Sequence, residues 1–598
     1  MKARAALALL LLTASVAIAY RVRATQQDVA PASLAAYVPS DALLTIESPD
    51  FASLLHQWTH SAECKSWLAS GNHSVFQNSR LFGRLTDAQT SFATAAGLPA
   101  GVDLLHQVAG KESVFAWYDI GKLQFLYITR MPAGQVDQTQ LFQARASFQR
   151  RHASNADFYI RTSAADYSTV AFARVPSPSG DLVLLATRED LIANALKLIA
   201  SSSSANAIQQ QPWFRDVSAA LPPETPAPAL HMVLNLERIA NDPHFRSYWI
   251  QRNITWTRQF RAAASDLYLE PHHFREERVL LPKSTTTEPA MLNLAPLAAL
   301  PPTSTGVYRV LATQDPALAA TAIQEKLLGR NTAPSSNPDQ APDPTVDAPQ
   351  TGSATDLETR IDALPLVSPS ASTDALRQLL ESAGLNAVLT LSSAQNPTQQ
   401  ADLWIPIHSA VVLRTANSAN QQALASALEQ ALRGELTAGG IGINFQPTTL
   451  VGVPVDALTG PRHLFCAMST SRAQGNLILL ADDESLLSEL LHHLAIGSPE
   501  TTPLPATSIA VFNHSTQRAP YLRLTSLIDG TNHPAQASPT PIAPASNGTT
   551  RDGAPPAFFS QNLGSLSNTF ADLQSERVVE RTVDSNLRET VTYTWDTQ

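Results

Sequence analysis

The chain contains an internal repeat, and this repeat constrains the fold more than any other feature of the sequence. Residues 180–200 read GDLVLLATREDLIANALKLIA, and residues 475–495 read GNLILLADDESLLSELLHHLA. Nine of the 21 aligned positions are identical. In each copy a short apolar run follows a glycine and leucines then recur at helical spacing, which predicts a buried strand followed by a helix. Thr187 and Asp482 are expected to cap the two helices.

The correspondence extends outward from this unit. Matching elements, given for the first and then the second half, are strands 43–47 and 307–312, helices 51–58 and 317–328, strands 123–129 and 410–415, helices 138–150 and 420–433, and strands 231–236 and 508–513. The first half carries an extra helix at 212–221, and long alternating strands close the halves at 276–281, 576–583 and 588–595.

This pattern predicts an α+β protein with an internal duplication. The two halves, 30–286 and 290–598, are each expected to form a mixed or antiparallel sheet with helices packed on one face. A doubly wound parallel sheet is the alternative, but the closing strands are typical of antiparallel hairpins.

The offset between the two copies locates an insertion. The opening segments are 262 residues apart and the central units 295, so the second half should hold 33 extra residues between these points. Residues 331–355 lie there, are rich in Pro, Asp and Thr, and are predicted to be disordered. Residues 530–556 have a similar composition and are predicted to be loose.

The N-terminus is typical of an export signal. Lys2 and Arg4 precede the apolar run 5–16, and Ala17-Ile18-Ala19 then provides the small residues that signal peptidase recognises. We expect residues 1–19 to be a cleaved signal peptide. The alternative is an uncleaved anchor in the inner membrane at residues 5–20, although this stretch is shorter than the roughly 20 residues that span a bilayer.

Composition excludes some functions. Residues 290–598 carry a net charge of −12 and residues 1–289 one of +2, with no basic stripe interleaved with aromatics, so nucleic-acid binding is not expected. The two cysteines, Cys64 and Cys466, are not equivalent in the repeat. They are predicted to be unrelated buried thiols, with a bridge between the halves as the alternative.

Short phrases near the N-terminus resemble one bacterial family. They are the Val38-Pro39-Ser40-Asp41-Ala42-Leu43 opening, residues 101–105 (GVDLL) and residues 110–116 (GKESVFA). In this order they are similar to the uncharacterised exported proteins of the DUF3352-like family, a domain of unknown function. Lys111 stands where the family prefers a second glycine. The resemblance implies an exported protein and carries no activity or site residues.

The sequence contains no signature of a known catalytic or cofactor site, such as a nucleophile elbow, a phosphate loop or a zinc-protease motif. Three groups of polar residues are nevertheless candidate sites. Glu489, His492 and His493 share a predicted helix and resemble a metal site, but a solvated helix face is the better interpretation. His272, His273, Glu276 and Glu277 lead into a strand, whose alternation would separate neighbours onto opposite faces.

The third constellation is His60 and Cys64, four residues apart near Trp58 and Trp67, where an imidazolium could lower the pKa of the thiol. No orienting third group is visible, so a structural cysteine is expected. The sequence therefore predicts no catalytic residue, no cofactor and no metal.

These observations predict a bacterial protein of the periplasm or cell envelope that is not an enzyme and acts as a binding or structural module. Its expected partner is an envelope protein, a lipid or a glycan, with membrane contact only through an uncleaved N-terminus. One alternative is a hydrolase with a site between the halves, in which His60, His106 and an aspartate would converge. The other is a solute-binding protein hinged at residues 284–289.

Overall fold

The computed structural model divides the chain into two compact units, which are described separately. Unit 1 comprises residues 1–47 and 92–215, and unit 2 comprises residues 48–91 and 216–598. These units differ from the predicted halves 30–286 and 290–598, whose boundary stays a prediction. The structure describes residues 33–69, 73, 77, 80–99, 103–119, 121–164, 166–201, 205–221, 224, 226–242, 257–270, 273–284, 291–328, 373–394, 407–433, 445–458, 463–471, 474–496, 502–518 and 573–595.

Several predicted segments lie outside the described residues. They are the signal peptide or anchor at 1–20, the insertion at 331–355, the loose segment at 530–556 and all but the first residue of the hinge at 284–289.

The described residues form an α+β fold, as the sequence predicts. The pairings whose registers are defined are all antiparallel, so the doubly wound parallel alternative is wrong. The helices are η1 (Leu34–Tyr37), α2 (Phe51–His60), α3 (Ala62–Ala69), α5 (Arg80–Ala96), α6 (Leu104–Val108), α7 (Ala133–Val136), α8 (Gln140–Gln143), η2 (Ala144–Ser147), α9 (Glu189–Ala200), η3 (Ile208–Gln210), α10 (Pro212–Ala220), α11 (Leu236–Ile239), α14 (Ala295–Ala298), α15 (Pro316–Ile323), the π-helix η4 (Gln324–Leu328), α17 (Asp374–Ala383), α18 (Gln421–Arg433) and α19 (Glu484–Ile496).

Unit 1 is built on one sheet with the strand order β1-β2-β3-β7-β6-β5-β4. Helix α9 packs on β5, β6 and β7. Phe172 in β6 contacts the rings of Phe142, Phe148 and Tyr159 at centroid distances of 4.9, 4.9 and 5.3 Å. The strands are β1 (Leu44–Ser48), β2 (Ser113–Asp119), β3 (Gln124–Met131), β4 (Gln149–Ala153), β5 (Ala156–Thr162), β6 (Thr169–Val175) and β7 (Asp181–Ala186).

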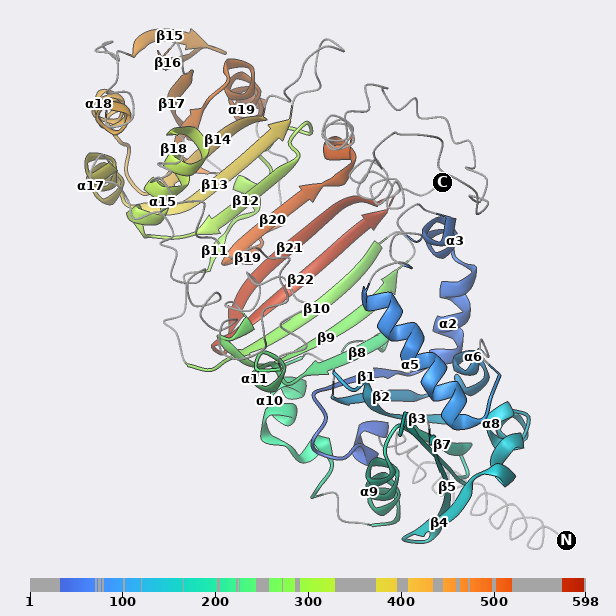
Figure 1. Cartoon of the computed structure of the whole chain (residues 1–598). Coiled ribbons are helices and arrows are strands. Elements are labelled where there is room, and N and C mark those ends of the chain that lie inside the picture. The colour runs from blue at the N-terminus through green and yellow to red at the C-terminus, as the bar shows by residue number, and fades with distance from the viewer. Residues whose placement is uncertain are drawn as a thin grey trace, which may run out of the picture. The chain divides into compact units, whose positions relative to one another are not determined.

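Unit 2 contains a longer antiparallel sheet with the order β8-β9-β10-β22-β21-β20-β12-β13-β14-β18-β17-β16-β15. Strands far apart in the sequence lie side by side at its centre, where β10 pairs with β22 (Figure 1). Strands β11 (Leu292–Asn293) and β19 (Pro505–Ala506) pair separately. The long sheet contains β8 (Leu230–Leu234), β9 (Phe260–Glu270), β10 (His273–Pro282), β12 (Val307–Ala312), β13 (Leu385–Ala394), β14 (Ile407–Thr415), β15 (Gln446–Leu450), β16 (Val453–Leu458), β17 (Leu464–Ser471), β18 (Gly475–Ala481), β20 (Ser508–Asn513), β21 (Leu573–Val583) and β22 (Asn586–Trp595).

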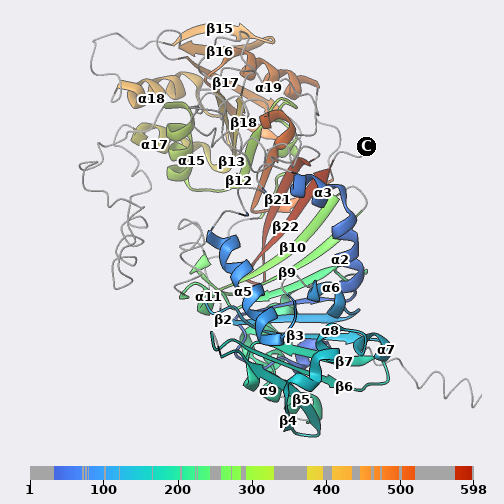
Figure 2. The same cartoon turned by 45° about the vertical axis from the view of Figure 1, so that its right-hand side comes forward.

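Helices cover both faces of this sheet, so the prediction of helices on one face only is wrong for unit 2. Leu389 and Leu479 face one core that includes α14 and α19. Val411 and Leu480 face a second core that includes α15, η4, α17 and α18. Figure 2 shows α15, α17 and α18 on one side of β13 and α19 on the other. Strands buried on both faces carry continuous apolar runs, as β18 does.

The repeated strand–helix unit forms as predicted, but its caps are shifted by one residue. Arg188 and Asp483 are the residues that precede α9 and α19, and Asp483 accepts a hydrogen bond from the Leu486 amide. Thr187 and Asp482 bind the neighbouring strand instead. Their side chains accept hydrogen bonds from the amides of Phe125 and Ser409, at 3.0 and 2.8 Å. Another difference is the predicted helix 138–150, which is only α8 and η2 before β4 begins.

Gln324, in the π-helix η4, is a polar residue at a buried position. Its side chain is 1% exposed, and neither its amide nitrogen nor its carbonyl oxygen has a partner among the described residues. Unsatisfied buried polar atoms cost about 1–3 kcal/mol each.

We therefore expect Gln324→Met to stabilise this part of unit 2 by about 1 kcal/mol or more, because it keeps the volume and removes both polar atoms. The measurement is the opening free energy of the β13 and β14 amides in native-state hydrogen exchange. The matched control is Gln422→Met on the exposed face of α18, which should change it by less than about 0.5 kcal/mol. A loss of protection in the Gln324 variant alone would show that the amide has a partner.

Candidate functional site

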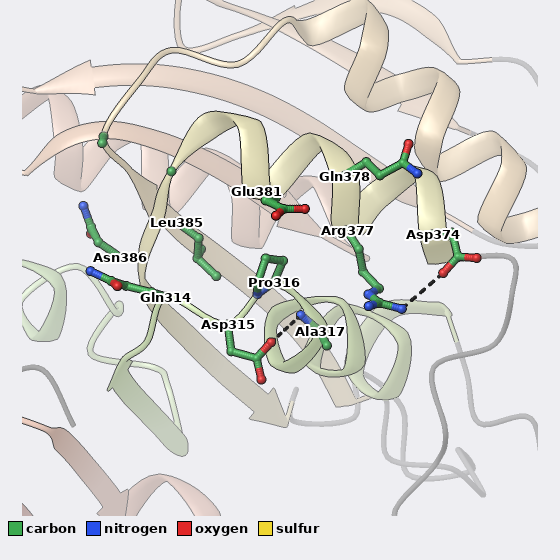
Figure 3. Close-up of a pocket in the computed structure, with 12 residues that line it drawn as sticks. Gln314, Asp315, Pro316, Ala317, Asp374, Arg377, Gln378, Glu381, Leu385 and Asn386 are labelled. Carbon is green, nitrogen blue, oxygen red and sulfur yellow. Dashed lines mark hydrogen bonds and ion pairs between the residues drawn. The ribbon is translucent and has the colours of Figure 1, made fainter. Parts of the chain in front are cut away.

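A pocket in unit 2 lies between α15 and α17 (Figure 3). Its volume is about 760 Å³, within the usual range for small-molecule sites. It is lined by Gln314, Asp315, Pro316, Ala317, Asp374, Arg377, Gln378, Glu381, Gly384, Leu385, Asn386 and Ala416.

Local sequence explains how two helix ends come to line this pocket. Asp315 caps α15 by accepting a hydrogen bond from the Ala317 amide at 2.9 Å, and Pro316 occupies the first helical position, as the sequence predicts. Helix α17 ends at Gly384, whose φ of 68° lies in the left-handed region that favours glycine. The chain then turns into β13, which places Asn386 at the pocket wall.

The charges in the pocket are mostly negative. Arg377 is the one guanidinium among the lining residues, against the carboxylates of Asp315, Asp374 and Glu381. Its Nη1 lies 3.2 Å from Asp374 Oδ1, one turn earlier on the same helix. Figure 3 shows Arg377 and Glu381 projecting from α17 toward α15.

A half-buried cation, Arg414, positions one of the pocket amides. The Arg414 Nε donates to Asn386 Oδ1 at 2.7 Å, and its Nη1 donates to the Asn293 carbonyl at 3.1 Å. Burial lowers the pKa of Arg414 below its usual range, although a guanidinium remains charged at neutral pH. Asn386 is therefore held with its oxygen occupied and its amide hydrogens available.

The chemistry of the lining suits the binding of a polar ligand. As far as the described residues form it, the lining includes no imidazole, thiol, amine or hydroxyl side chain. Amides, carboxylates and one guanidinium can orient a polar ligand by hydrogen bonds.

A cluster of charged side chains, which the sequence did not predict, lies where β10 pairs with β22. Arg278 on β10 donates to Glu276 Oε2 at 2.7 Å and contacts Glu589 on β22 at 3.4 Å. Burial would raise the pKa of Glu276, but the Arg278 guanidinium outweighs it and holds the pKa below its usual value. The Glu589 side chain is 8% exposed, and its burial raises its pKa. The Arg278 guanidinium lowers this pKa and the Glu580 carboxylate raises it further, so the net shift is upward.

The strand alternation predicted for Glu276 and Glu277 is confirmed. Glu276 bonds to Arg278 and Ser265, whereas Glu277 bonds to Arg275 and to the Thr590 hydroxyl. The two carboxylates therefore lie on opposite faces of β10 and cannot share an ion. His273 pairs with Glu270 at 2.8 Å, and His272 lies outside the described residues.

His60 and Cys64 do not share a helix. Helix α2 ends at His60, and Ser61, with a ψ of 155°, separates it from α3. The four-residue spacing therefore does not bring the imidazole over the thiol. Cys64 is buried, and Trp58 is half exposed.

The two cysteines are free thiols, and both are buried. Burial raises the pKa of the Cys466 thiol well above its usual value, which disfavours the reactive thiolate.

The remaining candidate residues serve local structure. Glu489 accepts a hydrogen bond from Ser304, and His493 Nδ1 lies 3.1 Å from the Leu300 carbonyl, so both fasten α19 to the segment after α14. His106 Nδ1 lies 2.6 Å from Asp103 at the start of α6. Partial burial raises the pKa of Asp103, but hydrogen bonds from His106 bring it below the usual value.

The described part of the chain contains neither a metal cluster nor a membrane-spanning helix. Within it, no three His, Cys, Asp or Glu side chains gather closely enough to hold a metal ion together. The helices described in it include none with the length and apolar character needed to cross a bilayer.

Comparison with known proteins gives little guidance. No protein-family model and no curated protein matches the chain. Crystal form I of the Treponema protein TP0453 matches with 10% sequence identity and a TM-score of 0.23, covering 42% of this chain and 80% of that chain. Crystal form III matches with 11% identity and a TM-score of 0.21, covering 42% and 81%. Similarity at these TM-scores supports no conclusion about fold or function.

Replacing Arg278 tests the ion cluster at the sheet centre. In Arg278→Met, Glu276 and Glu589 are left without their cation, and we expect the β10 and β22 amides to lose about 2 kcal/mol of protection at pH 7. This is below the roughly 3–5 kcal/mol for a fully buried pair, because the Arg278 side chain is 35% exposed.

The pH dependence of this loss has a definite sign. Without Arg278 the folded-state pKa values of both carboxyls lie above their unfolded values, so protonation favours the folded state as the pH falls. The loss should therefore shrink toward pH 4. Arg309→Met is the control, since Arg309 is exposed and 3.6 Å from Glu580, and it should cost less than about 1 kcal/mol. A loss that is independent of pH would contradict an electrostatic role.

Proposed function

We propose that this is an exported, non-enzymatic protein of the bacterial periplasm or cell envelope that binds a polar ligand in the pocket between α15 and α17. The observation that carries the proposal is the pocket lining, which combines three carboxylates, one guanidinium and several amides. The export-like N-terminus and the resemblance to the exported DUF3352-like family support the location.

Among the three partner classes expected from the sequence, the lining favours a glycan. Carboxylates and amides accept and donate hydrogen bonds to hydroxyl groups, and the fixed Asn386 amide offers donors in a defined direction. A lipid chain would need a predominantly apolar wall, to which this pocket contributes mainly Leu385, Pro316 and two alanines. A glycan fragment is therefore the ligand class that we propose.

We also propose that the fold arose by internal duplication. Counted along the chain, β1 to β7 of unit 1 and β12 to β18 of unit 2 follow the same order, 1-2-3-7-6-5-4. A helix follows the seventh strand in both, and both seventh strands begin beside a glycine with positive φ, Gly180 and Gly475.

The strand–helix junctions support the same proposal. The Phe125 amide donates to the Thr187 side chain, and the Thr187 amide donates to the Phe125 carbonyl. Ser409 and Asp482 make the same two hydrogen bonds, with the Ser409 amide donating to the Asp482 carboxylate and the Asp482 amide to the Ser409 carbonyl. A shared topology could recur by convergence, but an equivalent pair of bonds at the equivalent loop residue favours common descent of the two copies.

The junctions can be tested individually. Thr187→Val and Asp482→Val each remove one equivalent acceptor, so we expect the Phe125 amide and the Ser409 amide, respectively, to exchange at least about five times faster. Amide hydrogen exchange measured residue by residue checks this. A response at only one of the two sites would contradict the proposed equivalence.

Ligand binding can be tested with purified full-length protein and two probes, isolated peptidoglycan and an array of soluble oligosaccharides. We expect saturable binding to at least one probe, weakened at least about tenfold in Glu381→Gln and in Arg377→Gln, since each removes charge-assisted hydrogen bonds. Arg261→Gln is the matched control, because Arg261 is an exposed arginine of unit 2 that pairs with Asp216 away from the pocket lining.

The outcomes separate the possibilities. If both pocket variants bind the probe with wild-type affinity, the glycan binds outside this pocket. If the wild-type protein binds neither probe, the glycan proposal is contradicted. Turnover of a bound oligosaccharide would contradict the non-enzymatic assignment.

A further inference from the structure

Helix α2 carries two histidines one turn apart whose rings lie face to face. His56 and His60 are both exposed, their ring centroids are 4.2 Å apart, and the ring planes differ by 24°. Residues four apart lie on the same face of a helix, so the spacing brings both imidazoles to one patch of surface.

The hydrogen bonds of His60 define its tautomer. Its Nδ1 lies 2.8 Å from the His56 carbonyl and 3.2 Å from the Thr59 hydroxyl oxygen. The Thr59 hydroxyl donates its single hydrogen to the carbonyls of Leu55 and His56 at 3.0 Å, so toward His60 it can only accept. Both contacts therefore require the hydrogen of His60 on Nδ1, which leaves the Nε2 lone pair free.

This arrangement is the one that metal-binding histidines use. A ligating histidine commonly donates its other ring N–H to a backbone carbonyl, which fixes the ring and its tautomer. His56 has no hydrogen bond to its ring nitrogens among the described residues, so it can turn a nitrogen toward the same ion. Two ligand nitrogens at about 2.0–2.1 Å from a tetrahedral ion are about 3.3 Å apart. The ring centroids are 4.2 Å apart, so the His56 ring has to turn out of the stack for its nitrogen to point at the ion that His60 binds.

We propose that His56 and His60 form a two-imidazole surface site for a divalent transition-metal ion such as Zn²⁺, Ni²⁺ or Cu²⁺, with water completing the coordination. Imidazole nitrogen suits these ions, whereas Mg²⁺ prefers oxygen ligands. The site is independent of the α15–α17 pocket and of the function proposed for it.

Calorimetric titration of tag-free protein with Zn²⁺ at pH 7.5 tests the site. We expect His56→Gln and His60→Gln each to remove one zinc equivalent or weaken it at least about tenfold, with Mg²⁺ giving no heat in any form of the protein. Because both side chains are exposed, neither variant should alter folding. His492→Gln, an exposed histidine on α19, is the matched control and should leave the titration unchanged.

A second measurement avoids substitutions. Substoichiometric Cu²⁺ should broaden the ring resonances of His56 and His60 in the wild-type protein before those of the other histidines. Unchanged zinc stoichiometry in either histidine variant, or broadening that begins at other histidines, would overturn the proposal.

Discussion

The pairing of β10 with β22 is the constraint on which the rest of unit 2 depends. Eight consecutive residue pairs, from His273 opposite Thr594 to Leu280 opposite Leu587, join segments more than 300 residues apart in sequence. Closing so long a loop costs conformational entropy, which contacts within each segment do not offset. The hydrogen bonds and side-chain packing of the continuous ladder β9-β10-β22-β21 have to offset it. Each charged side chain that this ladder buries then needs an oppositely charged or hydrogen-bonding partner.

That requirement explains the charged composition of the central strands. On one face Arg278 contacts Glu276 and Glu589, and on the other Arg275 is paired with Glu224, Glu270 and Glu277. These groups are engaged with one another and are therefore poor candidates for catalysis. The polar groups best placed for a ligand lie instead at the ends of α15 and α17, where helix termini and a strand start leave them partly in water.

The sequence predicted the local elements more successfully than their packing. Strands 307–312 and 508–513 and the Asp315–Pro316 helix start follow from periodicity and cap chemistry, which are local. The predicted helix 51–58 ends two residues before α2 does. The helix caps differ from the prediction because Thr187 and Asp482 bind the adjacent strand. Helices on both faces of the sheet were not predicted, although β18 carries the continuous apolar run 477–481.

The candidate site was even less predictable. The α17 segment has a strong apolar periodicity that could have revealed a helix, but nothing local shows that it packs beside α15. Glu589 has no neighbour in sequence that would suggest Arg278. In contrast, the separation of Glu276 from Glu277 followed from strand alternation alone, because it needs no knowledge of the partner strand.

Native-state hydrogen exchange of β9, β10, β21 and β22 tests the central claim most directly. If the β10–β22 ladder unites these strands, their slowest amides should open together, with one shared free energy and the same dependence on denaturant. Separate opening of β9–β10 and β21–β22, with different free energies, would contradict the account.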